Sequence, residues 1–224
     1  MALHIAIDGP AGAGKSTIAK AVAQQLSIPY LDTGAMYRTL ALFALRNGVS
    51  PQDGPGVEAI LPDADIRVFY QDNVQHMLLN GEDVTGDIRT PEVSRGASDI
   101  GVHPPVREKL VELQQQVAKE GDVVMDGRDI CTVVMPHAAH KFFVTASAHE
   151  RALRRYKEML SRGETPPSLE EMEQTILARD HTDSTRACNP LRQTEDSMLI
   201  DTSDLTIEQS VQRVLDAIRV KSRA

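Results

Sequence analysis

Gly9-Pro10-Ala11-Gly12-Ala13-Gly14-Lys15-Ser16 is the stretch that decides the fold of this 224-residue chain. It matches the phosphate-loop pattern G-x-x-x-x-G-K-[ST] at every fixed position. The apolar run from Leu3 to Ile7 precedes it, and a helical pattern from Lys15 to about Leu26 follows it. A strand, a glycine-rich turn and a helix in this order bring backbone N–H groups and a helix N-terminus together around phosphate oxygens. The stretch therefore predicts a binding site for a nucleoside triphosphate.

Two side chains of this stretch have expected roles. The Lys15 ammonium is long enough to reach the β- and γ-phosphates, and the Ser16 hydroxyl is a ligand for Mg²⁺. We expect the triphosphate to contact the whole segment, which is Gly9, Pro10, Ala11, Gly12, Ala13, Gly14, Lys15, Ser16 and Thr17. This pattern alone does not separate a kinase from a GTPase or a motor ATPase.

Short apolar runs recur along the chain and are typical of strands buried on both faces. They lie at 3–7, 29–31, 122–126, 141–145 and 197–201. Helical patterns lie between them, for example at 35–46 and 104–119. Ser147 with Glu150 and Ser168 with Glu171 read as capping boxes that open two more helices. This alternation predicts an α/β fold with a doubly wound, five-stranded, mainly parallel sheet flanked by helices.

The middle of the chain departs from this alternation. Segments 66–70 and 76–79 flank turn residues at 71–73, which predicts a β-hairpin, and Thr90-Pro91 opens a helix. We interpret residues 50–90 as a hairpin-containing insertion in a single domain spanning 1–224.

Polar residues follow two of the strands. Leu31-Asp32-Thr33-Gly34-Ala35-Met36-Tyr37-Arg38 comes after the second strand, and Asp126-Gly127-Arg128-Asp129 after the third. Ligands of open α/β sheets bind at the carboxyl ends of the strands, so both segments are expected beside the phosphate loop. Arg128 can hold a phosphate with two hydrogen bonds, and Asp129 can accept a hydrogen bond from an amino group.

The charge balance excludes some classes of binding partner. The formal net charge is −8, which argues against a protein that coats nucleic acid or an anionic membrane. The two cysteines show no metal-binding or disulfide spacing, and no apolar run is long enough to span a bilayer. We expect a soluble, cytoplasmic protein, with a monomer as the default.

Several function classes remain to be compared. The chain has no Asn-Lys pair with which a GTPase reads guanine, and no long strand that ends in the Asp-Glu pair of a motor. A small phosphotransferase is therefore the leading class. The alternatives are a P-loop kinase acting on UMP, AMP or a sugar, and a non-catalytic ATP sensor.

Five segments together resemble the bacterial-type cytidylate kinases, which are P-loop nucleoside monophosphate kinases. They are Asp8–Thr17, Leu31–Arg38, Gly86–Val93, Asp126–Asp129 and Thr132–Pro136, and the likeness spans nearly the whole chain. Cys131 departs from the family, which usually has Gly at this position. The resemblance implies transfer of a phosphoryl group from ATP, with Mg²⁺, to CMP or dCMP, and an enlarged monophosphate-binding region.

The resemblance also implies roles for single residues. Thr33, Arg38 and Arg128 match positions that hold the monophosphate, and Ser98, Arg107 and Asp129 match contacts to the cytosine edge. Arg179, Asp183 and Arg186 match a segment that carries phosphate and ribose contacts. Cytosine has an exocyclic N4 donor where uracil has an acceptor, so a carboxylate at Asp129 suits cytosine and repels uracil.

Arginines gather near the end of the chain. Arg151, Arg154, Arg155 and Arg162 precede the Pro166-Pro167 tip, and the spacing puts the first three on one helix face. We interpret residues 151–170 as a short lid that brings arginine to the transferring phosphoryl group and excludes water. The expected catalytic residues are Lys15, Arg128 and Arg155. No general base is expected, because the acceptor phosphate is already ionised.

Overall fold

The computed structural model describes residues 2–72 and 74–221. The chain divides into two compact units by its internal contacts. The core unit combines Met1–Ile28 with Asp122–Ala224, and the middle unit is Pro29–Gly121. The phosphate-loop stretch lies in the core unit, and the predicted insertion at 50–90 falls inside the middle unit.

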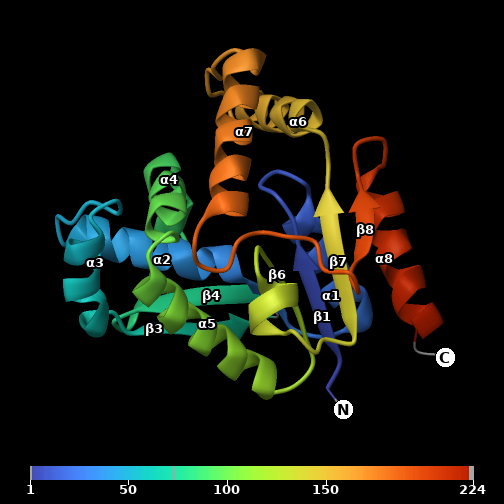
Figure 1. The fold of residues 1–224 in the computed structure, drawn as a ribbon, viewed down its shortest axis with the longest axis horizontal. Helices are drawn as coiled ribbons and strands as arrows, with labels where there is room; N and C mark the ends of the chain where they lie inside the picture. The colour runs from blue at the N-terminus through green and yellow to red at the C-terminus, as the bar shows by residue number, and fades with distance from the viewer. Residues whose placement is uncertain (1, 73, 222–224) are drawn as a thin grey trace. The chain divides into compact units, whose positions relative to one another are not determined.

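Parallel strands form the sheet of the core unit (Figure 1). They are β1 (His4–Asp8), β6 (Val123–Gly127), β7 (His140–Thr145) and β8 (Met198–Asp201). In the register, Ile7 lies opposite Asp126 of β6 and Phe142 of β7, so these strands end at one edge of the sheet. With β2 (Tyr30–Asp32) the full order is β2-β6-β1-β7-β8, which confirms the predicted five-stranded parallel sheet.

The α-helices of the core unit, among the described residues, are α1 (Lys15–Leu26), α6 (Ala148–Ser161), α7 (Leu169–Thr185) and α8 (Ile207–Lys221). Helix α1 packs against β6 and α8. Helices α6 and α7 lie against each other through a small apolar cluster, which is Ala152, Met172 and Ile176 with Ala148, Tyr156, Met159 and Leu169 around them. This cluster holds the α6–α7 pair together by burial of apolar surface.

The middle unit contains its own small sheet. β3 (Ile66–Gln71) pairs with β4 (Val74–Leu79) in antiparallel register, and β4 pairs with β5 (Glu82–Asp83). This confirms the predicted hairpin; of its predicted turn residues, position 73 lies outside the described residues.

Helices α2 (Thr33–Arg46), α3 (Gly54–Ile60), α4 (Pro91–Ile100) and α5 (Pro104–Lys119) make up the rest of the middle unit with two short 3₁₀ turns, η1 (Leu61–Asp63) and η2 (Asp87–Arg89). Helices α2 and α4 cross closely, because a Cβ at Gly96 of α4 would lie 3.2 Å from the Cβ of Ala41.

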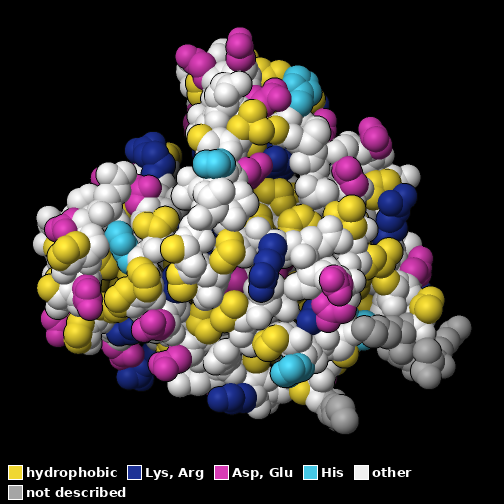
Figure 2. Space-filling model, viewed as in Figure 1, with side chains coloured by type: hydrophobic (Ala, Val, Ile, Leu, Met, Phe, Trp, Pro, Cys, Tyr) yellow, Lys and Arg dark blue, Asp and Glu magenta, His cyan; other side chains and the backbone are white. Residues whose placement is uncertain are grey.

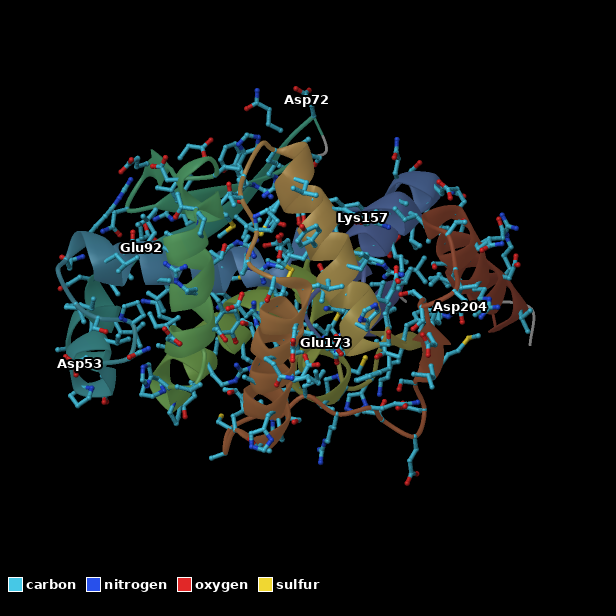
Figure 3. All side chains as sticks on the ribbon, turned by 90° about the horizontal axis from the view of Figure 1, so that it is seen from above. Asp53, Asp72, Glu92, Lys157, Glu173 and Asp204 are labelled. Atoms are coloured by element: carbon cyan, nitrogen blue, oxygen red, sulfur yellow. The ribbon has the colours of Figure 1, made fainter. Side chains whose placement is uncertain are left out.

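Side-chain caps explain where the prediction of the helices was inaccurate. Helix α2 begins at Thr33, two residues before the predicted start, because the Asp32 carboxylate accepts the N–H of Ala35 at 3.0 Å. Helix α3 was not predicted, since its glycines and proline read as a turn. Asp53 caps it by accepting the N–H of Gly56 at 3.2 Å, and it lies at the start of α3 in Figure 3.

The two predicted capping boxes have different outcomes. The box at Ser168 is complete, because Ser168 and Glu171 each accept a backbone N–H from the other residue. The box at Ser147 was wrong in one half. Ser147 accepts the N–H of Glu150, but the Glu150 carboxylate pairs with Arg154 at 3.1 Å.

Charged side chains of both signs are spread over the face of the molecule drawn in Figure 2. Acidic side chains are visible over both units there, as the net charge of −8 leads one to expect. Within residues 2–72 and 74–221, no helix has the length and apolar character needed to cross a membrane.

Candidate nucleotide site

The phosphate loop connects β1 to α1 and has a backbone that glycine makes possible. Gly12 and Gly14 have φ angles of 77° and 88°, in the left-handed region that other residues avoid. A Cβ at Gly9 would lie 1.9 Å from the carbonyl oxygen of Val144 in β7, so no side chain fits there. Gly14 caps α1 without a side-chain hydrogen bond, which leaves the first N–H groups of the helix for an anion.

Lys15 is buried inside this loop. Its Nζ atom donates a 2.7 Å hydrogen bond to the carbonyl oxygen of Pro10. Burial and the nearby positive charge of Arg128 lower the pKa of Lys15 to about 7, against the opposing pull of Asp126 and Asp8. A phosphate group placed against the loop would supply the negative charge that this buried ammonium needs.

Ser16, the expected Mg²⁺ ligand, pairs with Asp126, for which no role was expected. The Ser16 hydroxyl donates to the Asp126 carboxylate at 2.9 Å, and Asp126 is buried at the end of β6. A hydroxyl and a carboxylate are oxygen donors of the kind that Mg²⁺ prefers. The sequence does contain a signal for a role of Asp126, because this aspartate directly follows the apolar run Val123-Val124-Met125 at the end of a strand.

The described residues contain no group of three or more His, Cys, Asp or Glu arranged to hold a metal ion. A cation at Ser16 and Asp126 would therefore need further ligands, which phosphate oxygens and water can provide.

Asp8, at the end of β1, is fully buried and holds the turn that follows Asp129. Its two carboxylate oxygens accept the N–H groups of Ile130 at 2.9 Å and Cys131 at 2.8 Å. Burial raises the pKa of Asp8 to about 6, although these hydrogen bonds oppose the rise. They fix the start of η3 (Ile130–Val134), a π-helical turn, and so the backbone directly after Asp129.

Cys131 was the departure from the family pattern beside Asp129. Its thiol is buried and lies toward the sheet, 3.7 Å from the carbonyl oxygen of Ala6 and 3.8 Å from that of Phe142. Burial raises the pKa of this thiol, which makes it unreactive. Asp129 itself is 3% exposed.

Arg128, Asp183 and Arg186 form a charged cluster in the core unit. Arg128 Nε donates to Asp183 at 2.8 Å, and Arg186 approaches the same carboxylate at 3.5 Å. Burial works against ionisation of Asp183, but the charge and hydrogen bond of Arg128 outweigh it and lower the pKa of Asp183. Arg179 adds positive charge at the same carboxylate. The structure therefore brings together four of the predicted acceptor residues, three of them arginines.

The other predicted acceptor residues lie in the middle unit. Arg38 Nη2 donates to Asp32 at 2.6 Å on the first turns of α2, and Thr33 is buried at the start of that helix. Arg107 is 2% exposed, with its guanidinium 5.4 Å from the ring centroid of Tyr37.

Arg107 also connects to the end of α4. Its Nη1 atom donates to the carbonyl oxygen of Gly101 at 2.9 Å, and half-buried Ser98 lies on the last turn of that helix. Arg107, Tyr37 and the segment from Ser98 to Gly101 therefore form one group within the middle unit.

The four arginines expected in the lid have different surroundings. Arg151 is buried, Arg154 bonds Glu150 and the backbone and side chain of Thr202, and Arg162 pairs with Glu158. Arg155 is exposed on α6, and no hydrogen bond or ion pair engages it among the described residues. The structure therefore buries Arg151 inside the unit, whereas Arg155 lies at the surface of the same helix.

Solved structures share this fold. A gluconokinase from Sinorhizobium meliloti aligns over 99% of this chain and 94% of its own with a TM-score of 0.52 at 12% identity. An uncharacterized protein from Eubacterium ventriosum aligns over 98% and 99% with a TM-score of 0.57 at 11% identity. The phosphate loop, buried Lys15 and the Ser16–Asp126 pair on a parallel sheet define a P-loop protein.

Sequence comparisons identify the family. The family model described as cytidylate kinase matches residues 5–220. A cytidylate kinase from Carboxydothermus hydrogenoformans is 49% identical over 98% of this chain and 99% of its own length. One from Caldicellulosiruptor bescii is 48% identical over 96% and 94%. The chain belongs to the cytidylate kinase family, as the resemblance had indicated.

Proposed function

We propose that this chain transfers the γ-phosphoryl group of ATP to the phosphate of CMP or dCMP, giving ADP and CDP or dCDP. Membership of the cytidylate kinase family supports this activity. The structural observation that carries it is the presence, in one unit, of a phosphate loop with a buried lysine and of the Arg128–Asp183–Arg186 cluster. Lys15 and the arginines of the cluster form two separate groups of positive charge, which suits a reaction that brings two phosphate groups together.

The donor binds at residues 9–17. Backbone N–H groups of the loop and of the first turn of α1 hold the phosphates, and Lys15 neutralises their charge. Ser16 and Asp126 would hold Mg²⁺, which supplies positive charge to the β- and γ-phosphates when it is bound.

The acceptor is held by cations and read by a carboxylate. Thr33, Arg38 and Arg128 bind the monophosphate, Arg179, Asp183 and Arg186 contact phosphate and ribose, and Ser98, Arg107 and Asp129 contact the cytosine edge. Burial of Asp129 and Arg107 supports a role in base reading, because a desolvated polar group discriminates strongly between a matching and a clashing base edge.

The chemistry needs alignment and charge neutralisation. The second pKa of a phosphate monoester is about 6, so the acceptor oxygen is already a nucleophile at neutral pH and no general base is required. Lys15, Arg128 and Arg155 supply the compensating charge. The exposed position of Arg155 supports a lid at 151–170, because a side chain without a partner is available to meet a bound phosphoryl group.

A panel of acceptors tests the proposal. Purified protein with Mg²⁺ and ATP is offered CMP, dCMP, UMP, AMP and gluconate, and ADP release is followed with a coupled assay. We expect rapid turnover of CMP or dCMP and at least about 10-fold lower kcat/KM for UMP. Faster turnover of AMP, UMP or gluconate would replace the proposal with a different small-molecule kinase. Binding of ATP without turnover of any acceptor would indicate a sensor.

A further inference from the structure

Arg151 connects three parts of the core unit from a buried position. Its Nε atom donates to the carbonyl oxygen of Ala146 at 2.9 Å, directly after β7. Its Nη1 atom donates to the carbonyl oxygen of Ala11 in the phosphate loop at 3.1 Å and to Asp180 of α7 at 3.0 Å. Its Nη2 atom donates to the second oxygen of Asp180 at 2.5 Å. One planar guanidinium therefore bonds the loop, the end of a strand and a helix at once.

The stem of the same side chain also packs on the loop. A Cβ placed on Gly12 would lie 3.4 Å from the Cβ of Arg151 and 3.7 Å from its Cγ. Arg151 is 4% exposed and the Asp180 side chain is 25% exposed. A buried guanidinium needs its carboxylate partner, because loss of that partner leaves an uncompensated charge. The position of Asp180 is therefore tied to that of the loop.

Asp180 lies on the part of α7 that carries the proposed acceptor contacts. Arg179 precedes it, and Asp183, one turn further along the helix, holds Arg128 at 2.8 Å and lies 3.5 Å from Arg186. A helix is stiff over one turn, so a displacement of Asp180 also displaces Asp183. A continuous series of contacts thus leads from Ala11 and Gly12 to Arg128 through Arg151, Asp180 and Asp183.

We propose that Arg151 and Asp180 are a positioning pair that couples occupancy of the phosphate loop to binding at the acceptor contacts of α7. The pair touches neither reacting phosphate. It determines the position of Asp183, and with it of Arg128 and Arg186, when the loop holds a triphosphate. This inference rests on the proposed function for the assignment of α7 to the acceptor. Coupling of this kind is reciprocal, so each ligand increases the binding affinity of the other by the same factor.

The α6–α7 pair offers a matched control. His149 of α6 and Glu173 of α7 also form a pair between these helices, at 3.1 Å, and Figure 3 shows Glu173 on α7. Among the described residues, no hydrogen bond or ion pair joins His149 or Glu173 to the phosphate loop, and the apolar cluster around Ala152 and Met172 packs the helices independently of either pair. Asp180→Asn removes the charge and one acceptor oxygen of the positioning pair, whereas Glu173→Gln makes the same chemical change at the control pair.

The experiment measures the Kd of CMP by titration calorimetry, with and without a saturating non-hydrolysable ATP analogue and Mg²⁺. In the unchanged protein we expect the analogue to lower the Kd of CMP at least about 5-fold. In Asp180→Asn we expect this factor to fall below about 2, and in Glu173→Gln and Asp180→Glu to stay at the value of the unchanged protein. The reverse titration, of the analogue with and without CMP, must give the same factor in each protein.

Three results would overturn the inference: a factor near one in the unchanged protein, a full factor in Asp180→Asn, or an equal loss in Glu173→Gln. Arg151→Lys serves as a second variant, should Asp180→Asn not fold by circular dichroism. It keeps the charge but lacks the planar fork that reaches several acceptors, and the same loss of coupling is expected. If the unchanged protein binds another monophosphate and not CMP, the proposed function fails, and the coupling is measured with that monophosphate.

Discussion

The hydroxyl of Ser16, in the first turn of α1, donates a hydrogen bond to the carboxylate of Asp126, at the carboxyl end of β6. The bond joins two segments that are far apart in sequence, and it orients both oxygens at the start of the phosphate-binding helix. Asp126 is buried, so its carboxylate is held by the sheet and does not move freely. This arrangement gives the first prediction.

Asp126→Asn should weaken the response to Mg²⁺, because an amide is a poorer ligand than a carboxylate. We expect about a 10- to 100-fold loss of activity or of apparent Mg²⁺ affinity, measured as the rate against Mg²⁺ concentration at fixed ATP. The control is Asp122→Asn, which lies just before β6 and accepts the N–H of Leu3. An unchanged Mg²⁺ profile in Asp126→Asn would remove this residue from the metal site.

Binding of ATP should be accompanied by proton uptake at Lys15. Its pKa is lowered to about 7 without ligand, so the amine is largely neutral at pH 8. Phosphate charge favours the ammonium and raises the pKa, so about one proton is taken up at pH 8 and few at pH 6. Calorimetry in two buffers of different ionisation enthalpy measures this number. Lys15→Met should abolish the uptake with the fold intact; persistence of the uptake in that variant would assign it to another group.

Asp8 should give the free energy of unfolding a defined pH dependence. Its folded pKa of about 6 lies above the ordinary aspartate pKa of 3.8, so the native state binds the proton more tightly than the unfolded state does. The stability contributed by protonated Asp8 is fully present below pH 3.8 and is lost as the pH rises through 6. Asp8→Asn should therefore gain about 3 kcal/mol in unfolding free energy relative to the unchanged protein as the pH rises from well below 3.8 to well above 6, measured by urea unfolding. A difference that does not vary with pH would contradict the prediction.

Asp129→Ala should reduce the preference for CMP over UMP more than it affects ATP binding. Loss of a buried carboxylate that accepts from the cytosine amino group and repels the uracil carbonyl removes about 1–3 kcal/mol of discrimination. The measurement is the ratio of kcat/KM for the two acceptors, together with the Kd of an ATP analogue. An unchanged ratio would show that another residue reads the base.

Arg155→Ala should lower kcat at least about 10-fold and leave the melting temperature unchanged, because the side chain is exposed and forms no bond among the described residues. The matched control is Lys157→Ala, which removes another exposed cation from α6, the helix on which Figure 3 labels Lys157. Equal kcat values in the two variants would exclude a specific contribution of Arg155 to transfer.

Much of the core unit could be predicted from sequence because its strands are short, apolar and separated by capped helices. The phosphate loop was equally readable, since its glycines and Lys15 occupy fixed spacings. Helix α3 could not be predicted, because Gly54-Pro55-Gly56 has the composition of a turn and only the Asp53 cap makes it helical. The π-helical turn after Asp129 also escaped prediction, because Asp8, from the other end of the chain, holds it.

The residues of the site that were missed share one physical property. Asp8, Asp126 and Asp180 are carboxylates whose partners lie far along the chain, and a local pattern carries no information about such pairs. The burial of Arg151 escaped prediction for the same reason: helical spacing places it beside Arg154 and Arg155, and only its distant hydrogen-bond partners show that it is buried. Local spacing predicts which face of a helix a residue occupies but not what that face meets.

The contact between Gly9 and Val144 has a consequence for how this site can evolve or be transplanted. The backbone carbonyl oxygen of Val144 in β7 fills the space that a side chain at position 9 would need. The shape of the loop therefore depends partly on a strand that lies more than a hundred residues further along the sequence. A peptide limited to β1, the loop and α1 would keep every residue of the motif but would lack the β7 backbone against which the loop packs. Because the contact is with a backbone carbonyl, the loop depends on the position of β7 and not on which side chain stands at residue 144.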